Sequence, residues 1–176
     1  ELIEQNKHTI QNADLLGGEP LLQKQNERLL EILDPGTAIS IVTNLSVNLE
    51  NNKIYNSLKK RKKVSWRLSI DHIGDKLEYI RTGASWSKIL HNINLLKQDF
   101  PNSTITVLPV YSIWNATDVN EICSFINDNK FLSHWQLANQ TENSSVYGTD
   151  TFIVFNHNTE IKSLAISAID SLSTKD

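Results

Sequence analysis

A pair of glycines followed by a carboxylate and a proline, Gly17-Gly18-Glu19-Pro20, is the stretch of this chain best suited to ligand chemistry. Glycines adopt backbone angles that other residues avoid, and they let a ligand approach the main chain closely. Pro20 fixes its own φ and favours an extended backbone at Glu19. Glu19 is therefore expected at the carboxyl end of a strand, where α/β folds bind ligands. The alternative is a tight strand-to-helix turn with an incidental acid, because short motifs also match by chance.

The composition is that of an ordinary globular protein. The chain has 176 residues, enough for a single domain over 1–176, and its 17 basic and 20 acidic residues give a formal net charge of -3. This balance gives no argument for binding nucleic acid or an anionic membrane. The five cations at 59–63 are expected to close a helix as a solvated surface rather than to bind nucleic acid. No apolar run approaches the roughly 20 residues that span a bilayer.

Cysteine use and the first residue bear on where the protein acts. The one cysteine, Cys123, cannot form an intrachain disulfide or hold a metal cluster by itself. No signal peptide is visible, so a cytoplasmic protein is expected. Because the chain opens on Glu1 and contains no methionine, we expect it to be a piece of a longer protein.

Short apolar runs alternate with amphipathic segments along most of the chain. Strands are expected at 13–16, 38–43, 64–70, 104–113, 133–138 and 151–155, with a loop at 71–75. Helices are expected at 21–33, about 50–62, 85–99, 118–129 and 159–172. Pro109 weakens the fourth strand or marks a bulge in it. The repeat predicts an α/β fold with right-handed βα units on a parallel sheet, as part of a barrel or as a doubly wound sheet.

The helical periods also predict which side chains are buried and where one helix begins. In the helix at 21–33, Leu22, Leu29 and Leu33 are expected on one face, with Leu30 beside them. The apolar period of the helix at 85–99 is formed by Trp86, Ile89, Leu90, Ile93, Leu96 and Phe100. The expected inward residues of the other helices include Ile54, Tyr55 and Leu58, Val119, Ile122, Cys123 and Ile126, and Leu164. Asp118 and Glu121 have the spacing of a capping box at the start of the helix at 118–129.

The residues that follow the strands form a recognisable set. They are the Gly-Gly-Glu-Pro loop, Thr43-Asn44, Ser69-Ile70-Asp71 and Asn115. Together they resemble the radical S-adenosylmethionine (SAM) enzymes, most closely the group that joins a partial (βα)6 TIM barrel to a twitch or SPASM extension. The resemblance covers roughly residues 10–170. It places 69–81 at the fourth strand of that barrel and the loop after it, so that the first strand here is the family's second.

This resemblance implies a SAM site. In the family the Gly-Gly-Glu loop binds the amino group of SAM, so Gly17, Gly18 and Glu19 would do so here. A carboxylate and exposed backbone carbonyls are the acceptors that an ammonium group needs. Ser69 and Arg81 would lie near the ribose and carboxylate of SAM, with a structural role as the alternative for Arg81.

Three further residues complete the implied cofactor site. Thr43 and Asn44 would line the mouth of the barrel, and Asn115 would lie near the adenosine end of SAM. The group resembled includes many enzymes that act on peptides, so a peptide is the candidate substrate.

The chain departs from the family at the metal cluster. The family's Cys-x3-Cys-x2-Cys loop has no counterpart here, and Cys123 cannot replace it. The [4Fe-4S] cluster is therefore expected only in the full-length protein, and the chain as it stands is expected to be inactive. His72 stands where the family often has glycine. The absent first strand would also expose a sheet edge, which predicts marginal solubility.

Two other functions compete with a fragment of a radical SAM enzyme. The first is a degenerate, non-catalytic barrel that acts as a binding or scaffold module. The second is a metal-dependent hydrolase or lyase that uses Asp71, His72 and Asp75, although these residues share one loop with no second histidine at ligand spacing.

Overall fold

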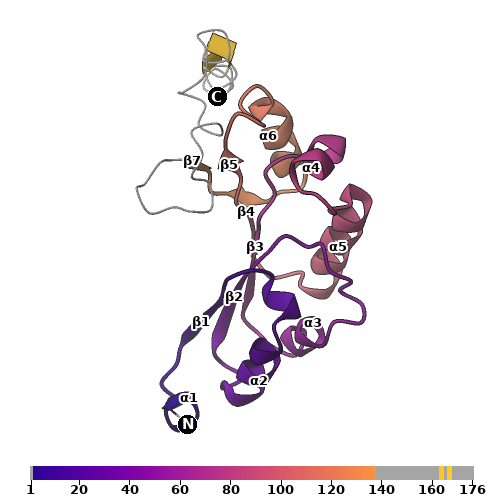
Figure 1. Cartoon of the computed structure of the whole chain (residues 1–176). Coiled ribbons are helices and arrows are strands. Elements are labelled where there is room, and N and C mark those ends of the chain that lie inside the picture. Colours follow the sequence, from indigo (N-terminus) through magenta and orange to yellow (C-terminus); the bar gives the residue numbers. More distant parts are fainter. Residues whose placement is uncertain (1, 138–162, 165, 168–176) are drawn as a thin grey trace. The chain divides into compact units, whose positions relative to one another are not determined.

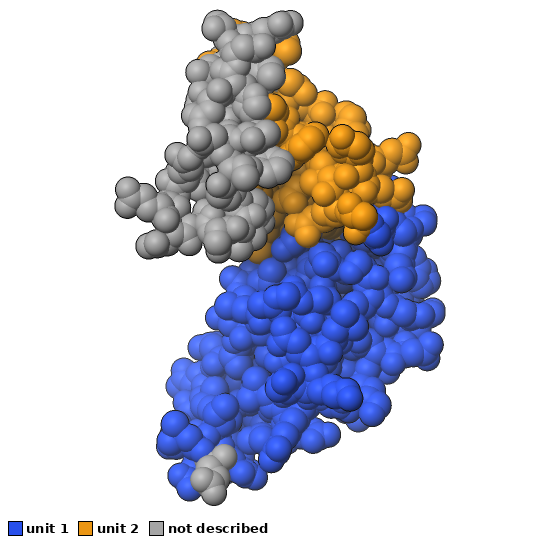
Figure 2. Space-filling view, viewed as in Figure 1, with its two compact units in different colours: residues 1–69, 83–106 blue, residues 70–82, 107–176 orange. Residues whose placement is uncertain are grey.

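The computed structural model describes residues 2–137, 163–164 and 166–167. The chain divides into two compact units, residues 1–69 with 83–106 and residues 70–82 with 107–176 (Figure 2). The single domain over 1–176 stays a prediction. The expected strand at 151–155 lies outside the described residues, as does most of the expected helix at 159–172.

The first unit is built on a parallel sheet. After a short helix α1 (Leu2–Asn6), the strands β1 (Asn12–Leu15), β2 (Ala38–Thr43) and β3 (Val64–Leu68) lie side by side in that order (Figure 1). Leu15 stands opposite Ile41, and Ile41 opposite Trp66, and all three side chains are buried. Side chains alternate between the two faces of a strand, so the buried apolar residues of the three strands gather on one face. The expected parallel βα arrangement is confirmed here.

Helical segments connect these strands. The 3-10 helix η1 (Pro20–Leu22) and helix α2 (Lys24–Ile32) lie between β1 and β2, and α3 (Lys53–Leu58) lies between β2 and β3. Helix α5 (Trp86–Asp99) precedes β4 (Ile105–Val107), whose last residue belongs to the second unit. Ile54, Tyr55 and Leu58 are buried, as their spacing predicted, although α3 is shorter than expected.

Three aromatic rings join a helix, a strand and the end of another helix within the first unit. Phe100, directly after α5, packs edge-on against Tyr55 of α3 and Trp66 of β3, with ring centroids 5.5 and 5.1 Å apart. The Tyr55 hydroxyl donates a hydrogen bond of 2.8 Å to Asp99 Oδ2. Burial and this carboxylate raise the pKa of Tyr55, so the phenol stays protonated. Edge-on aromatic contacts add to the stabilisation from burial.

The second unit is smaller and more irregular. Its helices are α4 (Gly74–Ile80) and α6 (Val119–Asp128), and its strands are β5 (Val110–Tyr111), β6 (Leu132–Ser133) and β7 (Gln136–Leu137). β5 pairs in parallel with β7. Val119, Ile122 and Ile126 of α6 are buried as predicted, and Cys123 packs against a small core of Tyr111, Ala116 and Val119.

Several local expectations are wrong. Leu22 is 68% exposed, because the chain enters its helix through a 3-10 turn at Pro20 that buries Leu21 instead. Leu90 is 36% exposed, since it lies beside the buried stripe of α5 rather than in it, and Leu164 is 52% exposed. The strand expected at 104–113 is divided into β4 and β5 at Pro109, the residue that was expected to weaken it or to mark a bulge. Helix α4 was not expected.

None of the helices that the structure describes combines the length and the apolar character that a bilayer crossing requires.

Candidate functional site

The Gly-Gly-Glu-Pro loop has the backbone that its sequence predicted. Gly17 has a φ of 84° and Gly18 has a φ of 52°, backbone angles that residues with a side chain rarely adopt. A Cβ added at Gly17 would meet nothing within 4 Å, so its φ, and not crowding, requires glycine there. Gln23, at the N-cap of α2, holds the loop in place because its Nε2 donates a hydrogen bond to the Gly17 carbonyl. Both glycines are exposed, which leaves the outer side of the loop open to a ligand.

Glu19 is extended and half-buried, and its carboxylate is held by three donors of its own unit. Its Oε1 accepts from the Thr43 hydroxyl at 2.7 Å and from Leu21 N at 3.3 Å. Its Oε2 accepts from Asn44 N at 3.1 Å. A carboxylate offers about four acceptor positions, so the donors among the described residues leave one position for another donor.

The ends of three neighbouring strands meet at this carboxylate. Glu19 follows β1, Thr43 and Asn44 end β2, and Ser69 follows β3, with Ser69 N donating to the Thr43 carbonyl at 2.9 Å. The parallel order of the strands explains this convergence, because their carboxyl ends share one edge of the sheet. The structure thus brings together Glu19, Thr43, Asn44 and Ser69, which the sequence had placed in one site.

Thr43 has a structural task at this edge. Its side chain is 1% exposed, and its hydroxyl donates to Glu19 while accepting from Leu45 N at 3.0 Å. Asn44 is more accessible, and its Oδ1 accepts from Ser46 N at 2.9 Å. The two residues therefore shape the loop after β2 as well as facing Glu19.

Leu45 is a residue of the site that sequence reasoning missed. It is fully buried and has a φ of 53°, a left-handed backbone that is strained in a leucine. The sequence carried no signal for this angle, since the usual left-handed residues are glycine, asparagine and aspartate. Strain of this kind often accompanies a functional loop.

Arg81 and Asn115 lie in the second unit, where each has partners of its own. Arg81 Nε and Nη2 donate to Asp71 Oδ2 at 3.0 and 2.6 Å, and Asp71 Oδ1 accepts from Val110 N at 3.0 Å. Asn115 is fully buried and donates to the carbonyls of Asp71 and Val110 at 2.7 and 2.8 Å. Both residues hold Asp71 against the start of β5, and their roles towards SAM stay predictions.

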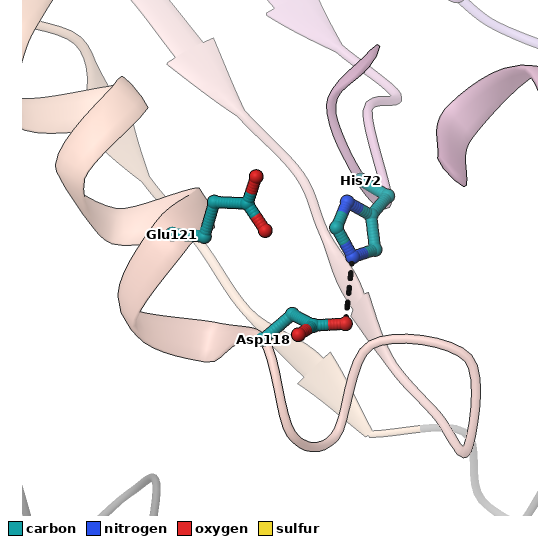
Figure 3. A group of neighbouring side chains, drawn as sticks. All are labelled: His72, Asp118 and Glu121. Carbon is teal, nitrogen blue, oxygen red and sulfur yellow. Dashed lines mark hydrogen bonds and ion pairs between the residues drawn. The ribbon is translucent and has the colours of Figure 1, made fainter. Parts of the chain in front are cut away.

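A second polar cluster in the same unit surrounds His72, which is fully buried (Figure 3). His72 Nε2 lies 3.1 Å from Asp118 Oδ2, and Lys76 Nζ lies 3.1 Å from that oxygen and 3.2 Å from Glu121 Oε2. Burial raises the pKa of the Asp118 carboxyl, but hydrogen bonds from His72 and Lys76 outweigh it, so the pKa falls below its ordinary value.

These partners correct the expected capping box. Asp118 stands at the N-cap of α6 but makes no side-chain cap hydrogen bond, because its carboxylate turns to His72 and Lys76. Glu121 likewise faces Lys76.

Ligand atoms of His72, Asp118 and Glu121 lie within 4.8 Å of one another, which raises the question of a metal ion. His72 Nδ1 accepts from Ile73 N at 2.8 Å, so the neutral ring carries its proton on Nε2. A histidine bound to metal through Nε2 would instead need that proton on Nδ1. Lys76 already supplies the positive charge between the carboxylates, so the cluster fits a hydrogen-bonded ion pair better than a metal.

The expected metal trio is not assembled. Asp71 is paired with Arg81, and Asp75 is exposed, while the group around His72 contains Asp118 and Glu121 instead. The loop spacing that suggested the trio said nothing of these partners, which lie 46 and 49 positions further along the chain.

Comparisons with solved structures show the fold. The chain matches Streptococcus suis SuiB bound to its precursor peptide SuiA with a TM-score of 0.66 and 19% identity, over 99% of this chain and 38% of SuiB. It matches anSMEcpe with bound AdoMet and Kp18Cys peptide with a TM-score of 0.62 and 16% identity, over 91% of this chain and 46% of anSMEcpe. The chain has a radical SAM-like fold. No protein-family model matches it, and no curated protein matches it by sequence.

This chain spans less than half the length of each of these two neighbours. A further match, SuiB bound to S-adenosylmethionine, has a TM-score of 0.59 at 19% identity and is covered over 38% of its length. AdoMet is SAM, so both neighbouring proteins have been seen with this cofactor.

The fold resembles that of proteins that bind SAM, and the residues of this chain fit SAM and an iron–sulfur cluster differently. The open acceptor position on Glu19 and the exposed glycine loop fit the ammonium group of SAM. Cys123, in contrast, is the chain's one cysteine, and burial in its apolar surroundings raises the pKa of its thiol. A single protonated thiol does not fit a [4Fe-4S] cluster, which needs several thiolates.

Proposed function

We propose that this chain is the SAM-binding part of a radical SAM enzyme that modifies a peptide, with the [4Fe-4S] cluster held by residues outside the chain. The observation that carries the proposal is the Glu19 carboxylate, held at the carboxyl ends of β1 to β3 with one acceptor position unused. The radical SAM-like fold supports it, because the neighbouring SuiB and anSMEcpe structures contain this cofactor.

Each proposed contact follows from the chemistry of this edge. Glu19 accepts one N–H of the SAM ammonium group, and the carbonyls of Gly17 and Gly18 accept the others. Asn44 and Ser69 contribute polar groups beside them, and Thr43 holds the carboxylate from behind. SAM supplies, when an iron–sulfur cluster reduces it, a radical that abstracts hydrogen from an unreactive carbon.

The second unit contributes two proposed residues. We propose that Arg81 lies near the ribose and carboxylate of SAM and that Asn115 lies near its adenosine end. Arg81 donates to Asp71 through Nε and Nη2, so Nη1 is the nitrogen proposed to contact SAM. A peptide substrate is proposed because peptides are bound in the neighbouring SuiB and anSMEcpe structures.

Calorimetric titration of the chain with SAM tests this proposal. Glu19→Gln removes the charge but keeps the shape, and a hydrogen bond to a charged group contributes about 1.5–3 kcal/mol, so SAM affinity should fall about 10- to 100-fold. Glu31→Gln, on the exposed side of α2, is the matched control and should leave affinity unchanged. The proposal is wrong if the unaltered chain does not bind SAM or if Glu19→Gln binds it equally well.

The second candidate is a barrel that binds SAM or a peptide without catalysis. The single cysteine favours it, because the chain itself cannot hold the cluster. Radical chemistry after addition of a separate cluster-bearing segment would exclude this candidate.

A further inference from the structure

The amide of Asn92 is the most deeply buried polar side chain of α5. It is 1% exposed and lies on the same helix face as Ile89, Ile93 and Leu96, among apolar residues. A buried amide in such surroundings costs stability unless its donors are satisfied. Its Nδ2 donates to two backbone carbonyls, those of Leu45 at 2.7 Å and Val47 at 2.8 Å.

Both carbonyls belong to the loop that follows β2. Leu45, two residues after the end of the strand, has the left-handed φ of 53°. Three interactions hold this strained residue in place: burial of its side chain, the hydrogen bond from its N to Thr43 Oγ1, and the Asn92 amide on its carbonyl. A strained backbone persists only when its surroundings fix it in this way.

The residue before Leu45 faces the proposed SAM site. Asn44 N donates to Glu19 Oε2 at 3.1 Å, and Asn44 lies between Thr43 and Leu45, which are joined by the hydrogen bond from Leu45 N to Thr43 Oγ1. We propose that Asn92 is a positioning residue of the SAM site, which holds the Leu45 turn so that Asn44 N–H and Thr43 Oγ1 orient the Glu19 carboxylate. The identity of the ligand in this inference rests on the proposed function. The role of Asn92 in holding the loop does not depend on that function.

Asn92→Asp removes the two hydrogen bonds that Asn92 donates but keeps the size of the side chain. Aspartate has the same shape but offers only acceptors to the two carbonyls, so it removes both donors. The Leu45 turn should then open, and Asn44 N should lose Glu19 as its acceptor. Leu96→Ala is the matched control, because Leu96 is fully buried on the same helix but has no hydrogen bond to the loop.

Amide hydrogen exchange measures the geometry without any ligand. In Asn92→Asp, exchange at Asn44 should become at least about tenfold faster relative to the amides of β2. In Leu96→Ala, Asn44 and β2 should change together. Unaltered relative protection of Asn44 in Asn92→Asp overturns the inference, whether or not the chain binds SAM. If Asn92→Asp does not fold, Asn92→Ser, which keeps one donor, replaces it with the same criterion.

Calorimetry then tests the link to the ligand. Methylthioadenosine lacks the amino-acid end of SAM and cannot use Glu19. Asn92→Asp should weaken SAM about tenfold and leave the affinity for methylthioadenosine unchanged. Equal weakening of both ligands, or of neither, overturns the positioning role. Failure of the unaltered chain to bind SAM would overturn the proposed function, and the exchange result would still decide the role of Asn92 in the loop.

Discussion

The carboxylate of Glu19 accepts hydrogen bonds from the Thr43 hydroxyl and from the N–H groups of Leu21 and Asn44. These bonds fix its orientation before a ligand arrives, so less conformational entropy is lost on binding. They also make the acid part of the fold, because each donor would lose its partner if the carboxylate were removed. The same side chain therefore serves stability and, in the proposed function, ligand binding, and a residue of the same shape without the charge, such as glutamine, is needed to separate the two.

Asp118 gives a prediction on pH. Its lowered pKa means that the folded protein binds this proton less readily than the unfolded chain, whose value is about 3.8. The stabilisation is therefore present above about pH 4 and is lost as the pH falls through the folded pKa. Asp118→Asn should lower the free energy of unfolding by about 1 kcal/mol at pH 7, through its weaker bonds to His72 and Lys76.

Urea unfolding at pH 7 and at pH 3 measures this effect. The difference between Asp118→Asn and the unaltered chain should shrink at the lower pH, because the unfolded chain takes up a proton at Asp118 below about pH 4 and part of the stabilisation by the charge is lost. Asp75→Asn, an exposed acid on α4, should show little difference at either pH. A difference for Asp118→Asn that is equally large at pH 3 would contradict the assigned role of the charge.

Sequence reasoning reached some residues of the site and not others. Glu19 and Thr43 were found because they end strands, and the parallel order of those strands brings them together. Leu45 and Asn92 were not found, since the left-handed turn and the amide that holds it exist only once α5 packs against the loop after β2. An asparagine inside an apolar helical stripe was the one available signal.

At the scale of elements, sequence patterns gave the type of each long segment better than its ends. β2 has the predicted bounds, while α3 ends at Leu58 rather than near 62. Short-range rules failed where a distant partner competed: the expected capping box at Asp118 gave way to His72 and Lys76. Pro109 acted as a strand breaker, which leaves only two residues in β5.

Helix α5 and the residue directly after it offer a prediction about buried and exposed positions. Phe100 is 6% exposed and touches Tyr55 and Trp66, so Phe100→Ala should leave a cavity and lower the free energy of unfolding by about 3–5 kcal/mol. Leu90, which was expected to point inward, is 36% exposed, so Leu90→Ala should cost less than about 1 kcal/mol. Chemical denaturation of both variants compares them directly. Equal losses would mean that the burial pattern of α5 is misassigned.

At the scale of the whole molecule, the parallel βα pattern predicted the α/β class, and the comparisons show a radical SAM-like fold. The division into two units was not predicted. The chain leaves the first unit after Ser69, returns at Gly83 and leaves again after Thr106. Compact units are defined by contacts between segments that are distant in the sequence. Local sequence patterns therefore do not reveal where the chain passes from one unit to the other.

The last prediction concerns what the whole chain can bind. Anaerobic reconstitution with iron and sulfide should yield no stoichiometric [4Fe-4S] cluster, because the chain has one cysteine and burial keeps its thiol protonated. Iron analysis and visible absorption after gel filtration measure the outcome, with Cys123→Ser as the control that should match the unaltered chain. The same preparation should still bind SAM through Glu19, since that contact needs no iron. Stoichiometric iron lost in Cys123→Ser would contradict this reading, because it would make Cys123 a ligand and place cluster chemistry within the chain itself.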